Sequence, residues 1–404
     1  MDDIEVPQYF ICPISLQIMK DPVTAVTGIT YDRESIEHWL FSGRNTTCPV
    51  TKQTLPKDSD LTPNHTLRRL IQAWCTANAS YGIDRIPTPK PPLNKVHVLK
   101  LIHDLWVPQL QFKTLKKMEA LAAENERNRR FMVEAGAAKA MVSLIITCFK
   151  KGQKTGLEEA LSVLHLIWIP MAETKLLVME NYDLITSITW ILGCEMDNHV
   201  AVKIHAVIVL KMIVDVANSN LLERLKPELF KGIIQILRDR ISQQATKAAL
   251  HVLLEAGPYG RNRMKIVEAG AVSKLIELEL GTPDNRTTEL IFGVLDNLCS
   301  CADGRAQLLG HAGGIAVVST RILRVSPAAD DRAIHILESI SKFSGTKEVL
   351  HEMLRVGAVS KLCMVLQADC AAYLKEKARK ILRLHSDVWK KSPCFSVNLS
   401  RNPR

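Results

Sequence analysis

The chain has 404 residues, of which 47% are apolar and 23% charged, and 52 lysines and arginines against 42 aspartates and glutamates give a net charge of +10. At about 100–200 residues per domain, this length allows two or three domains. The composition excludes a collagen-like or coiled-coil fibre, a wholly disordered chain and a small disulfide-stapled module, so we expect a folded protein with at least one large core.

The start of the chain, Met1–Glu5, is acidic and is not a basic stretch followed by an apolar run, so we expect no secretory signal in it. The best membrane candidate, Ala206–Leu210, is followed by Lys211 and Asp215 and is far shorter than the roughly 18 apolar residues that a span needs. Ten cysteines occur without a Cys-x-x-Cys pair. We therefore expect reduced thiols, no membrane span, and a location in the cytoplasm, with the nucleus as a second compartment.

The first predicted region spans residues 7–80 and mixes turns, short β-branched runs and two short helices. We expect one helix to be capped by Asp32, to run to about Phe41 and to stop at Gly43. A second helix should begin near Asn64. Its apolar residues recur at helical spacing and are interpreted as core positions: Leu67, Leu70, Ile71, Trp74 and Cys75. We therefore interpret Trp74 and Cys75 as structural rather than catalytic.

Two Cys-Pro turns in this region, at Cys12 and Cys48, have the spacing of a cross-braced zinc fold. The ligand count argues against a metal, because a structural zinc needs four thiolates or imidazoles that normally enter as Cys-x-x-Cys pairs. The partner positions hold Ser15 and Thr51, whose hydroxyls bind zinc poorly but form hydrogen bonds well. We predict no metal and no cofactor, with the loops held by hydrogen bonds and ion pairs among residues such as Ser15, Lys20, Asp32, Arg33, Glu34 and Thr51.

A domain boundary is predicted at Pro87–Pro92, where four prolines in six residues exclude a helix. We interpret residues 81–94 as an extended linker.

Residues 95–391 have helical periodicity and repeat. The first apolar residue after each helix break falls at positions 138, 184, 230, 272, 315 and 359, with breaks near 136, 182, 228, 270, 313 and 357. A period in the low forties built from helices indicates an armadillo or HEAT-type solenoid, since no single repeat can bury both of its faces. The predicted fold is therefore mainly α: a small α+β domain followed by an α/α superhelix of about six repeats. The alternative is an irregular helical bundle.

The positive charge is concentrated at the end of the chain, where residues 375–404 hold nine basic and two acidic residues. We interpret Tyr373–Arg383 as the amphipathic helix that caps the solenoid with a polar outer face, and residues 392–404 as a tail. The net charge therefore says little about nucleic acid.

Residues 7–80 resemble a U-box, the metal-free relative of the RING finger, through Cys12–Leu16, Asp21–Val23, Gly28–Arg33, Cys48–Thr51 and Pro63–Ile71. The order U-box, proline linker, armadillo array is similar to that of the plant U-box ubiquitin ligases. The resemblance implies a ligase that binds a ubiquitin-charged conjugating enzyme and a protein substrate, without a covalent ubiquitin intermediate. It also implies self-modification, self-association and a place in stress and plant defence responses.

The family's contacts to the conjugating enzyme fall on Ile14 and Leu16 in the first loop, Trp39 on the helix and Pro49 in the second loop. An aromatic side chain flanked by aliphatic and proline surfaces is typical of a protein-binding hot spot. The alternative is that Leu16 and Trp39 simply fill the core of a small domain.

The resemblance also places Lys52 where a cation touches both the conjugating enzyme and ubiquitin and orients the thioester, which is catalysis by orientation. Because lysine lacks the planar fork of arginine, its hydrogen bonds would be less directional. An ordinary surface lysine is the alternative.

Other functions receive little support from the sequence. Hydrolase, phosphate-loop, dinucleotide and metalloprotease motifs are absent. The second hypothesis is a non-enzymatic armadillo adaptor, but its groove would need repeated Trp and Asn on the third helices, where we expect only Trp190. Specific nucleic-acid binding lacks interleaved aromatics and a recognition motif.

Overall fold

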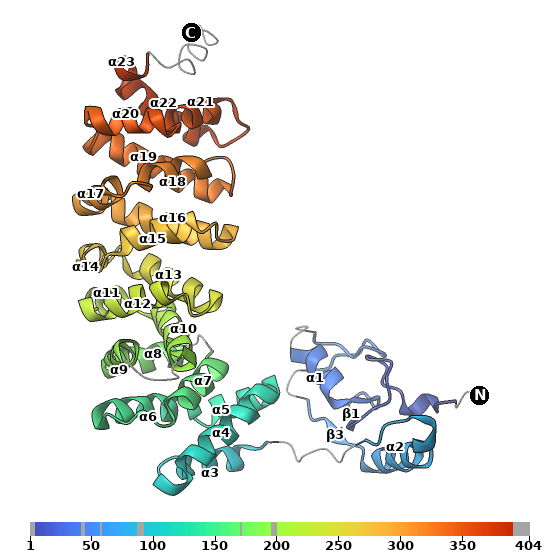
Figure 1. Ribbon diagram of the computed structural model, residues 1–404. Coiled ribbons are helices and arrows are strands. Elements are labelled where there is room, and N and C mark those ends of the chain that lie inside the picture. Colours follow the sequence, from blue (N-terminus) through green and yellow to red (C-terminus); the bar gives the residue numbers. More distant parts are fainter. Residues whose placement is uncertain are drawn as a thin grey trace. The chain divides into compact units, whose positions relative to one another are not determined.

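The computed structural model describes residues 5–41, 45–56, 59–86, 93–169, 172–194 and 200–390 (Figure 1). It divides into two compact units, one of residues 1–101 and 121–135 and one of residues 102–120 and 136–404. Gly43, the prolines of the predicted linker and the predicted tail at 392–404 lie outside the described residues.

The first unit contains a three-stranded antiparallel sheet in the order β2–β1–β3. Its strands are β1 (Pro22–Thr24), β2 (Thr30–Asp32) and β3 (Thr62–Pro63), and Val23 lies opposite Tyr31 on one side and Pro63 on the other. Gly28, with a φ of 80°, turns the chain between β1 and β2, a conformation that favours glycine. Helices α1 (Arg33–Phe41) and α2 (His65–Ala77) follow β2 and β3, and 3₁₀ turns occur at Gln8–Phe10 and Ala79–Tyr81.

The core of this domain forms where the sheet meets the two helices, with Val23, Ile36 and Ile71 fully buried. Helix α2 starts as expected, because the Asn64 side chain caps it by accepting a hydrogen bond from the N–H of Leu67. One predicted core position is wrong: Leu70 is 53% exposed. The apolar stripe of α2 is therefore narrower than its helical spacing suggested.

All further elements in the described residues are helices. They are α3 (Lys95–Asp104), α4 (Pro108–Glu124), α5 (Glu126–Glu134), α6 (Ala137–Lys151), α7 (Leu157–Ile167), α8 (Ala172–Glu180), α9 (Tyr182–Gly193), α10 (Val200–Val216), α11 (Ser219–Glu223), α12 (Pro227–Asp239), α13 (Gln243–Ala256), α14 (Asn262–Glu268), α15 (Ala271–Leu280), α16 (Asn285–Cys299), α17 (Ala302–Gly310), α18 (Gly314–Arg321), α19 (Pro327–Phe343), α20 (Lys347–Arg355), α21 (Ala358–Gln367), α22 (Ala372–Leu384) and α23 (Ser386–Trp389).

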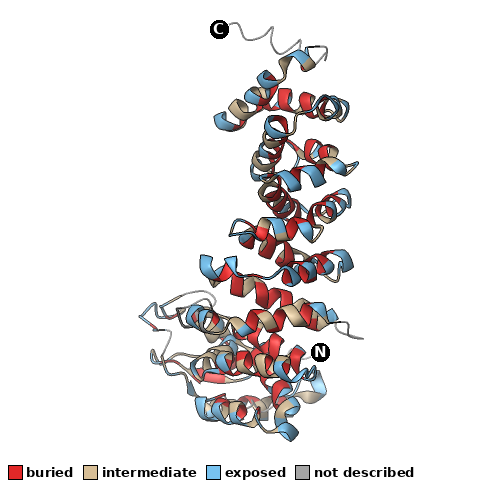
Figure 2. Cartoon of the chain, turned by 90° about the vertical axis from the view of Figure 1, so that its left-hand side faces the viewer, coloured by how far each residue is buried: buried red, intermediate tan, exposed pale blue. Residues whose placement is uncertain are grey.

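The second unit is built from helices that repeat in threes. The third helices, α7, α10, α13, α16, α19 and α22, pack one on the next, and the second helices, α6, α9, α12, α15, α18 and α21, form a parallel row (Figure 1). Buried residues lie on the faces where successive helices meet (Figure 2). This arrangement is an α/α superhelix of stacked repeats, in which each layer completes the core of its neighbours.

Helix breaks and inter-repeat hydrogen bonds recur with the sequence period. Gly136, Gly270 and Gly357 precede second helices with φ angles of 81°, 80° and 78°, a left-handed conformation that glycine adopts without strain. Side chains then bind backbone carbonyls one repeat away, as Asn262 Nδ2 does to the Leu222 oxygen at 2.7 Å. Such bonds satisfy helix-end carbonyls and set the spacing of the layers.

Trp190 lies on α9, a second helix, so its predicted position on a third helix was wrong. Among the described residues, no single helix is long and apolar enough to cross a membrane; α5 and α6 reach that length and composition only when taken together across their break.

Candidate functional site

The two Cys-Pro loops of the first unit share one backbone construction. The N–H of Cys12 and that of Cys48 each donate to the carbonyl of a glutamine five residues later, at 2.8 Å in both loops. Their carbonyls accept from the N–H groups of Leu16 and Lys52, at 2.9 and 3.0 Å. Residues 12–17 and 48–53 therefore form a matched pair of closed loops.

The fifth residue of each loop has a left-handed backbone. Leu16 has a φ of 56° and Lys52 a φ of 61°, a conformation that costs a non-glycine residue about 1–2 kcal/mol. Both side chains are exposed, Leu16 to 77%. A strained, exposed leucine contributes little to folding, and strain of this kind concentrates at functional sites. The sequence contained no glycine to signal either position.

Both loops are fastened to consecutive residues of β2 through their cysteine sulfurs. The N–H of Asp32 donates to Cys12 Sγ at 3.3 Å, and the Tyr31 hydroxyl lies 2.9 Å from Cys48 Sγ. Thr27 adds a hydrogen bond to Cys48 Sγ at 3.4 Å. Since α1 begins directly after Asp32, the two loops and the start of this helix meet at one point.

These hydrogen bonds change the acidity of the thiols. Burial raises the pKa of Cys48, but hydrogen bonds from Thr27, Thr51 and Tyr31 outweigh that effect and lower the pKa to about 6. Burial also raises the pKa of Cys12, but hydrogen bonds from the N–H groups of Ser15 and Asp32 outweigh that effect, and the pKa of Cys12 is lowered as well. The two sulfurs thus act as hydrogen-bond acceptors in the loops.

Trp39 connects α1 to the second loop, because its indole Nε1 donates to the Thr47 carbonyl at 2.9 Å. Trp39 and Ile14 are half-buried and pack partly against the core, and Pro49 is half-buried in its loop. The structure therefore brings the predicted docking residues onto three adjoining elements. Because Trp39 is half-buried, one part of its indole packs against the core and another part is accessible to a partner.

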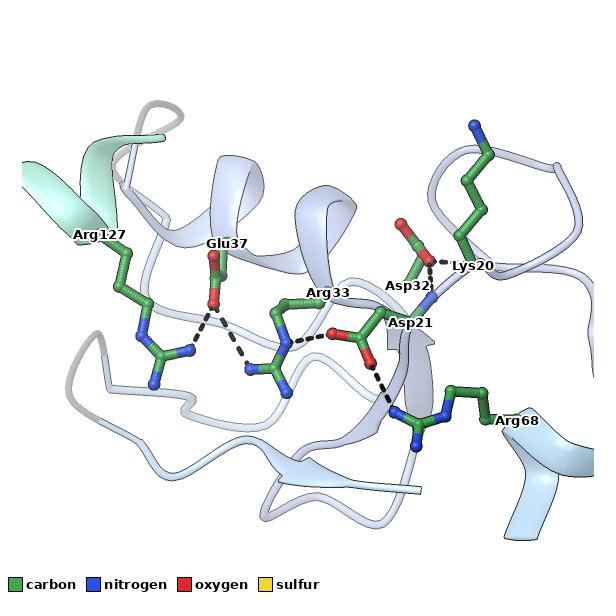
Figure 3. Close-up of polar contacts among 7 residues, drawn as sticks. All are labelled: Lys20, Asp21, Asp32, Arg33, Glu37, Arg68 and Arg127. Carbon is green, nitrogen blue, oxygen red and sulfur yellow. Dashed lines mark hydrogen bonds and ion pairs between the residues drawn. The ribbon is translucent and has the colours of Figure 1, made fainter. Parts of the chain in front are cut away.

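A chain of ion pairs links acidic and basic side chains around the start of α1 (Figure 3). Arg33 Nε lies 2.6 Å from Asp21 Oδ2, and Arg33 Nη1 lies 3.6 Å from Glu37 Oε1. Arg68 reaches Asp21 at 4.0 Å, and Arg127 of α5 reaches Glu37 at 2.9 Å. The network joins Asp21, the residue before β1, to α1, α2 and α5. Most of its members were missed from the sequence, because every pair except Arg33–Glu37 joins residues far apart in the chain, from 12 positions for Asp21–Arg33 to 90 for Glu37–Arg127.

The prediction that Asp32 caps the first helix is wrong. Asp32 Oδ1 accepts hydrogen bonds from the N–H groups of Lys20 and Asp21, at 2.7 and 2.9 Å, so it secures the segment between the first loop and β1 rather than the start of α1. Lys20 contributes its backbone N–H, and its side chain points away from the carboxylates (Figure 3). Glu34, which we also expected in the network, is exposed.

The donor set around the cysteines consists of hydroxyls and backbone N–H groups, and the described residues contain no group of three or more His, Cys, Asp or Glu that could hold a metal.

Comparison with known proteins agrees with this geometry. Residues 6–80 match the U-box domain family, and residues 97–402 match the family described as the plant U-box protein ARM repeat region. The chain belongs to the plant U-box proteins with armadillo repeats. Among its relatives in Arabidopsis thaliana are E3 ubiquitin-protein ligase PUB23, 48% identical over 98% of this chain and 97% of the relative, and PUB24, 46% identical over 98% and 96%.

Solved structures show the same fold for the repeats of this U-box protein. One comes from work on a phosphorylation switch that controls the interaction between cadherin and beta-catenin; its TM-score is 0.63 at 9% identity, over 82% of this chain and 61% of that one. An engineered protein has a TM-score of 0.55 at 18% identity, over 76% and 72%. The predicted fold class is confirmed. The prediction of a U-box ubiquitin-protein ligase is confirmed as well, and the adaptor alternative is not favoured.

Proposed function

We propose that a ubiquitin-charged conjugating enzyme docks on Ile14, Leu16, Trp39 and Pro49, and that a protein substrate binds the armadillo repeats. The observation that carries the docking site is the attachment of both Cys-Pro loops to Tyr31 and Asp32, which brings the two loops and α1 together. Leu16 exposes an apolar side chain at the cost of backbone strain. A partner that covers Leu16 would recover about 1.5–3 kcal/mol of apolar burial.

Lys52 supplies an orienting contact to donor ubiquitin in this proposal. It is exposed and occupies the second loop at the position that Leu16 occupies in the first, with the same left-handed backbone. A cation held there restricts a bound thioester to reactive orientations without itself acting as a nucleophile.

Family resemblance also supports proposals on the setting of the reaction. They are modification of the ligase itself, self-association, a location in the cytoplasm and nucleus, and a function in plant defence and stress responses. No disulfide bond joins the nine described cysteines, in keeping with a reducing compartment.

The docking site is tested by reconstitution with activating enzyme, a panel of conjugating enzymes, ubiquitin and ATP. Wild type should build ubiquitin chains, and Leu16→Ala, Trp39→Ala and Pro49→Ala should each reduce them at least tenfold. Leu16→Ala is the sharpest variant, because so exposed a side chain contributes little to the core. Arg69→Ala on α2 is an exposed control and should keep the wild-type rate. No chains with any conjugating enzyme would refute the ligase, and chains that survive Leu16→Ala would refute the docking site.

Lys52 is tested by single-turnover discharge of ubiquitin from the conjugating enzyme to free lysine. Lys52→Glu should lower the discharge rate at saturating ligase at least tenfold, and Lys52→Arg should equal or exceed wild type, since its planar fork makes more directional hydrogen bonds. Lys20→Glu, at an exposed lysine between the first loop and β1, is the matched control. A rate loss in Lys52→Glu that saturating ligase abolishes would show a binding contact only and contradict the orienting function.

A further inference from the structure

Four third helices of the solenoid line an open hollow of about 420 Å³. Its lining comes from α7, α10, α13 and α16, which belong to four successive repeats. Adjacent packed helices lie about 8–10 Å apart, so a hollow shared by four of them extends over about 25–30 Å. An extended peptide of about eight or nine residues covers that distance.

The apolar part of the lining includes one small residue, Ala248. Ala248 lies on α13 between Gln244 and His251, which share its face of the helix at helical spacing. Ile208 of α10 and Leu290 of α16 line the hollow on either side, and both are largely buried. A larger side chain at position 248 would fill the space, so the alanine leaves room for an apolar side chain of a ligand.

The walls carry cations and no carboxylate. Lys211, Lys247 and Arg286 line the hollow together with two histidines, and no aspartate or glutamate is among the lining residues. Each cation pairs with one carboxylate outside the lining, Asp215, Asp284 and Glu289, at 2.8 to 3.2 Å. One such bond uses one of three donors on a lysine and one of five on an arginine, so these pairs orient the cations and leave N–H groups for a ligand.

We propose that this hollow, which we call the third-helix pocket, binds an acidic peptide segment of the substrate in which carboxylates flank an apolar side chain. The proposal rests on the proposed function of the repeats as the substrate-binding part and names the class of substrate. The N–H groups that the three cations leave unused bind the acidic side chains, and the space over Ala248 takes the apolar one. A single-stranded nucleic acid suits the pocket less well, because no Phe, Tyr or Trp side chain lines it as a platform for base stacking.

Binding is tested on the full chain by fluorescence anisotropy with three labelled probes: a ten-residue peptide of alternating Glu and Leu, one of alternating Lys and Leu, and a ten-nucleotide oligothymidine. The acidic peptide should bind wild type at least tenfold more tightly than the basic peptide. Lys247→Glu combined with Arg286→Glu should weaken the acidic peptide at least tenfold, and Ala248→Leu at least fivefold. Lys231→Glu, at an exposed lysine of α12, is the matched control and should stay within twofold.

Three results would overturn the proposal: equal affinity for the two peptides, acidic-peptide binding that the double substitution leaves intact, or tighter binding of oligothymidine with the same sensitivity to the substitutions. Thermal unfolding of each variant guards against lost structure, and Ala248→Leu, which keeps all charges, separates shape from charge. Discharge of ubiquitin to free lysine by the wild-type protein is measured in parallel. Failure of that discharge refutes the proposed function, whereas failure of peptide binding with intact discharge refutes only the pocket.

Discussion

Removal of the Arg33 guanidinium tests whether the ion-pair network supports the docking site. Arg33 is 14% exposed and lies between Asp21, 20% exposed, and Glu37, so Arg33→Ala leaves two largely buried carboxylates with one partner fewer each. Breaking a fully buried pair costs about 3–5 kcal/mol. Because Asp21 keeps Arg68 at 4.0 Å and Glu37 keeps Arg127 at 2.9 Å, we expect a smaller loss, about 2–3 kcal/mol.

Hydrogen exchange on the full chain measures this loss locally. At about 1.4 kcal/mol per tenfold, amides of β1 and α1 should exchange about 30- to 150-fold faster in Arg33→Ala, while amides of α13 and α16 stay unchanged. Arg69→Ala, which removes an exposed arginine from α2, is the control and should change exchange by less than about threefold.

A double-mutant cycle separates the ion pair from the packing of the arginine stem. If the pair between Arg33 and Asp21 contributes as argued, Asp21→Asn should cost much less in the Arg33→Ala background than in wild type, with a coupling energy of about 1–2 kcal/mol. Equal effects of Arg33→Ala and Arg69→Ala, or a coupling energy near zero, would refute the argument that this network stabilises β1 and α1.

Three further substitutions test other contacts. Arg321→Ala leaves the buried Glu279, whose second oxygen has no hydrogen-bond partner, without its cation and should cost about 2–4 kcal/mol of stability in denaturant titrations at pH 7. Because burial already raises the pKa of Glu279, the folded state takes up a proton there more readily than the unfolded state, and the loss should shrink at pH 5. An equal loss at both pH values contradicts this. The pH dependence of stability from Cys48 has the opposite sign: because its pKa is lowered from 9.0 to about 6, its stabilising contribution is full above pH 9 and is lost as the pH falls through 6. After correction for the intrinsic pH dependence of hydrogen exchange, protection of β2 should rise from pH 6 to 9 more in wild type than in Cys48→Ala. Parallel profiles of the two proteins would disprove this. Gly293→Val places a Cβ against Arg332 Nη1 and should lower stability by about 1–3 kcal/mol in thermal unfolding followed by circular dichroism. An unchanged melting temperature would show that Arg332 moves aside without cost.

Periodic and local features of this protein could be read from its sequence. Apolar spacing and the recurring breaks at residues such as Gly136 and Gly270 predicted stacked helices, because helix periodicity and the conformational freedom of glycine are properties of short segments. Asn64 at the start of α2 is a cap for the same reason. Ser15 and Thr51 in the cysteine partner positions argued against zinc ligation from side-chain chemistry alone.

Contacts between distant segments required the tertiary structure. Whether Leu70 is core or surface depends on what lies against α2. Asp32 secures the segment before β1 rather than α1, because the pairing of β1 with β2 brings the N–H groups of Lys20 and Asp21 within its reach. The left-handed backbone of Leu16 and Lys52 follows from closure of each loop between paired segments and is not marked by residue type. The third-helix pocket likewise exists only when four repeats, each separated by about forty residues of sequence, place their third helices side by side. Sequence therefore determined the elements and the family, and packing between distant elements decided which side chains form a surface that can bind a partner.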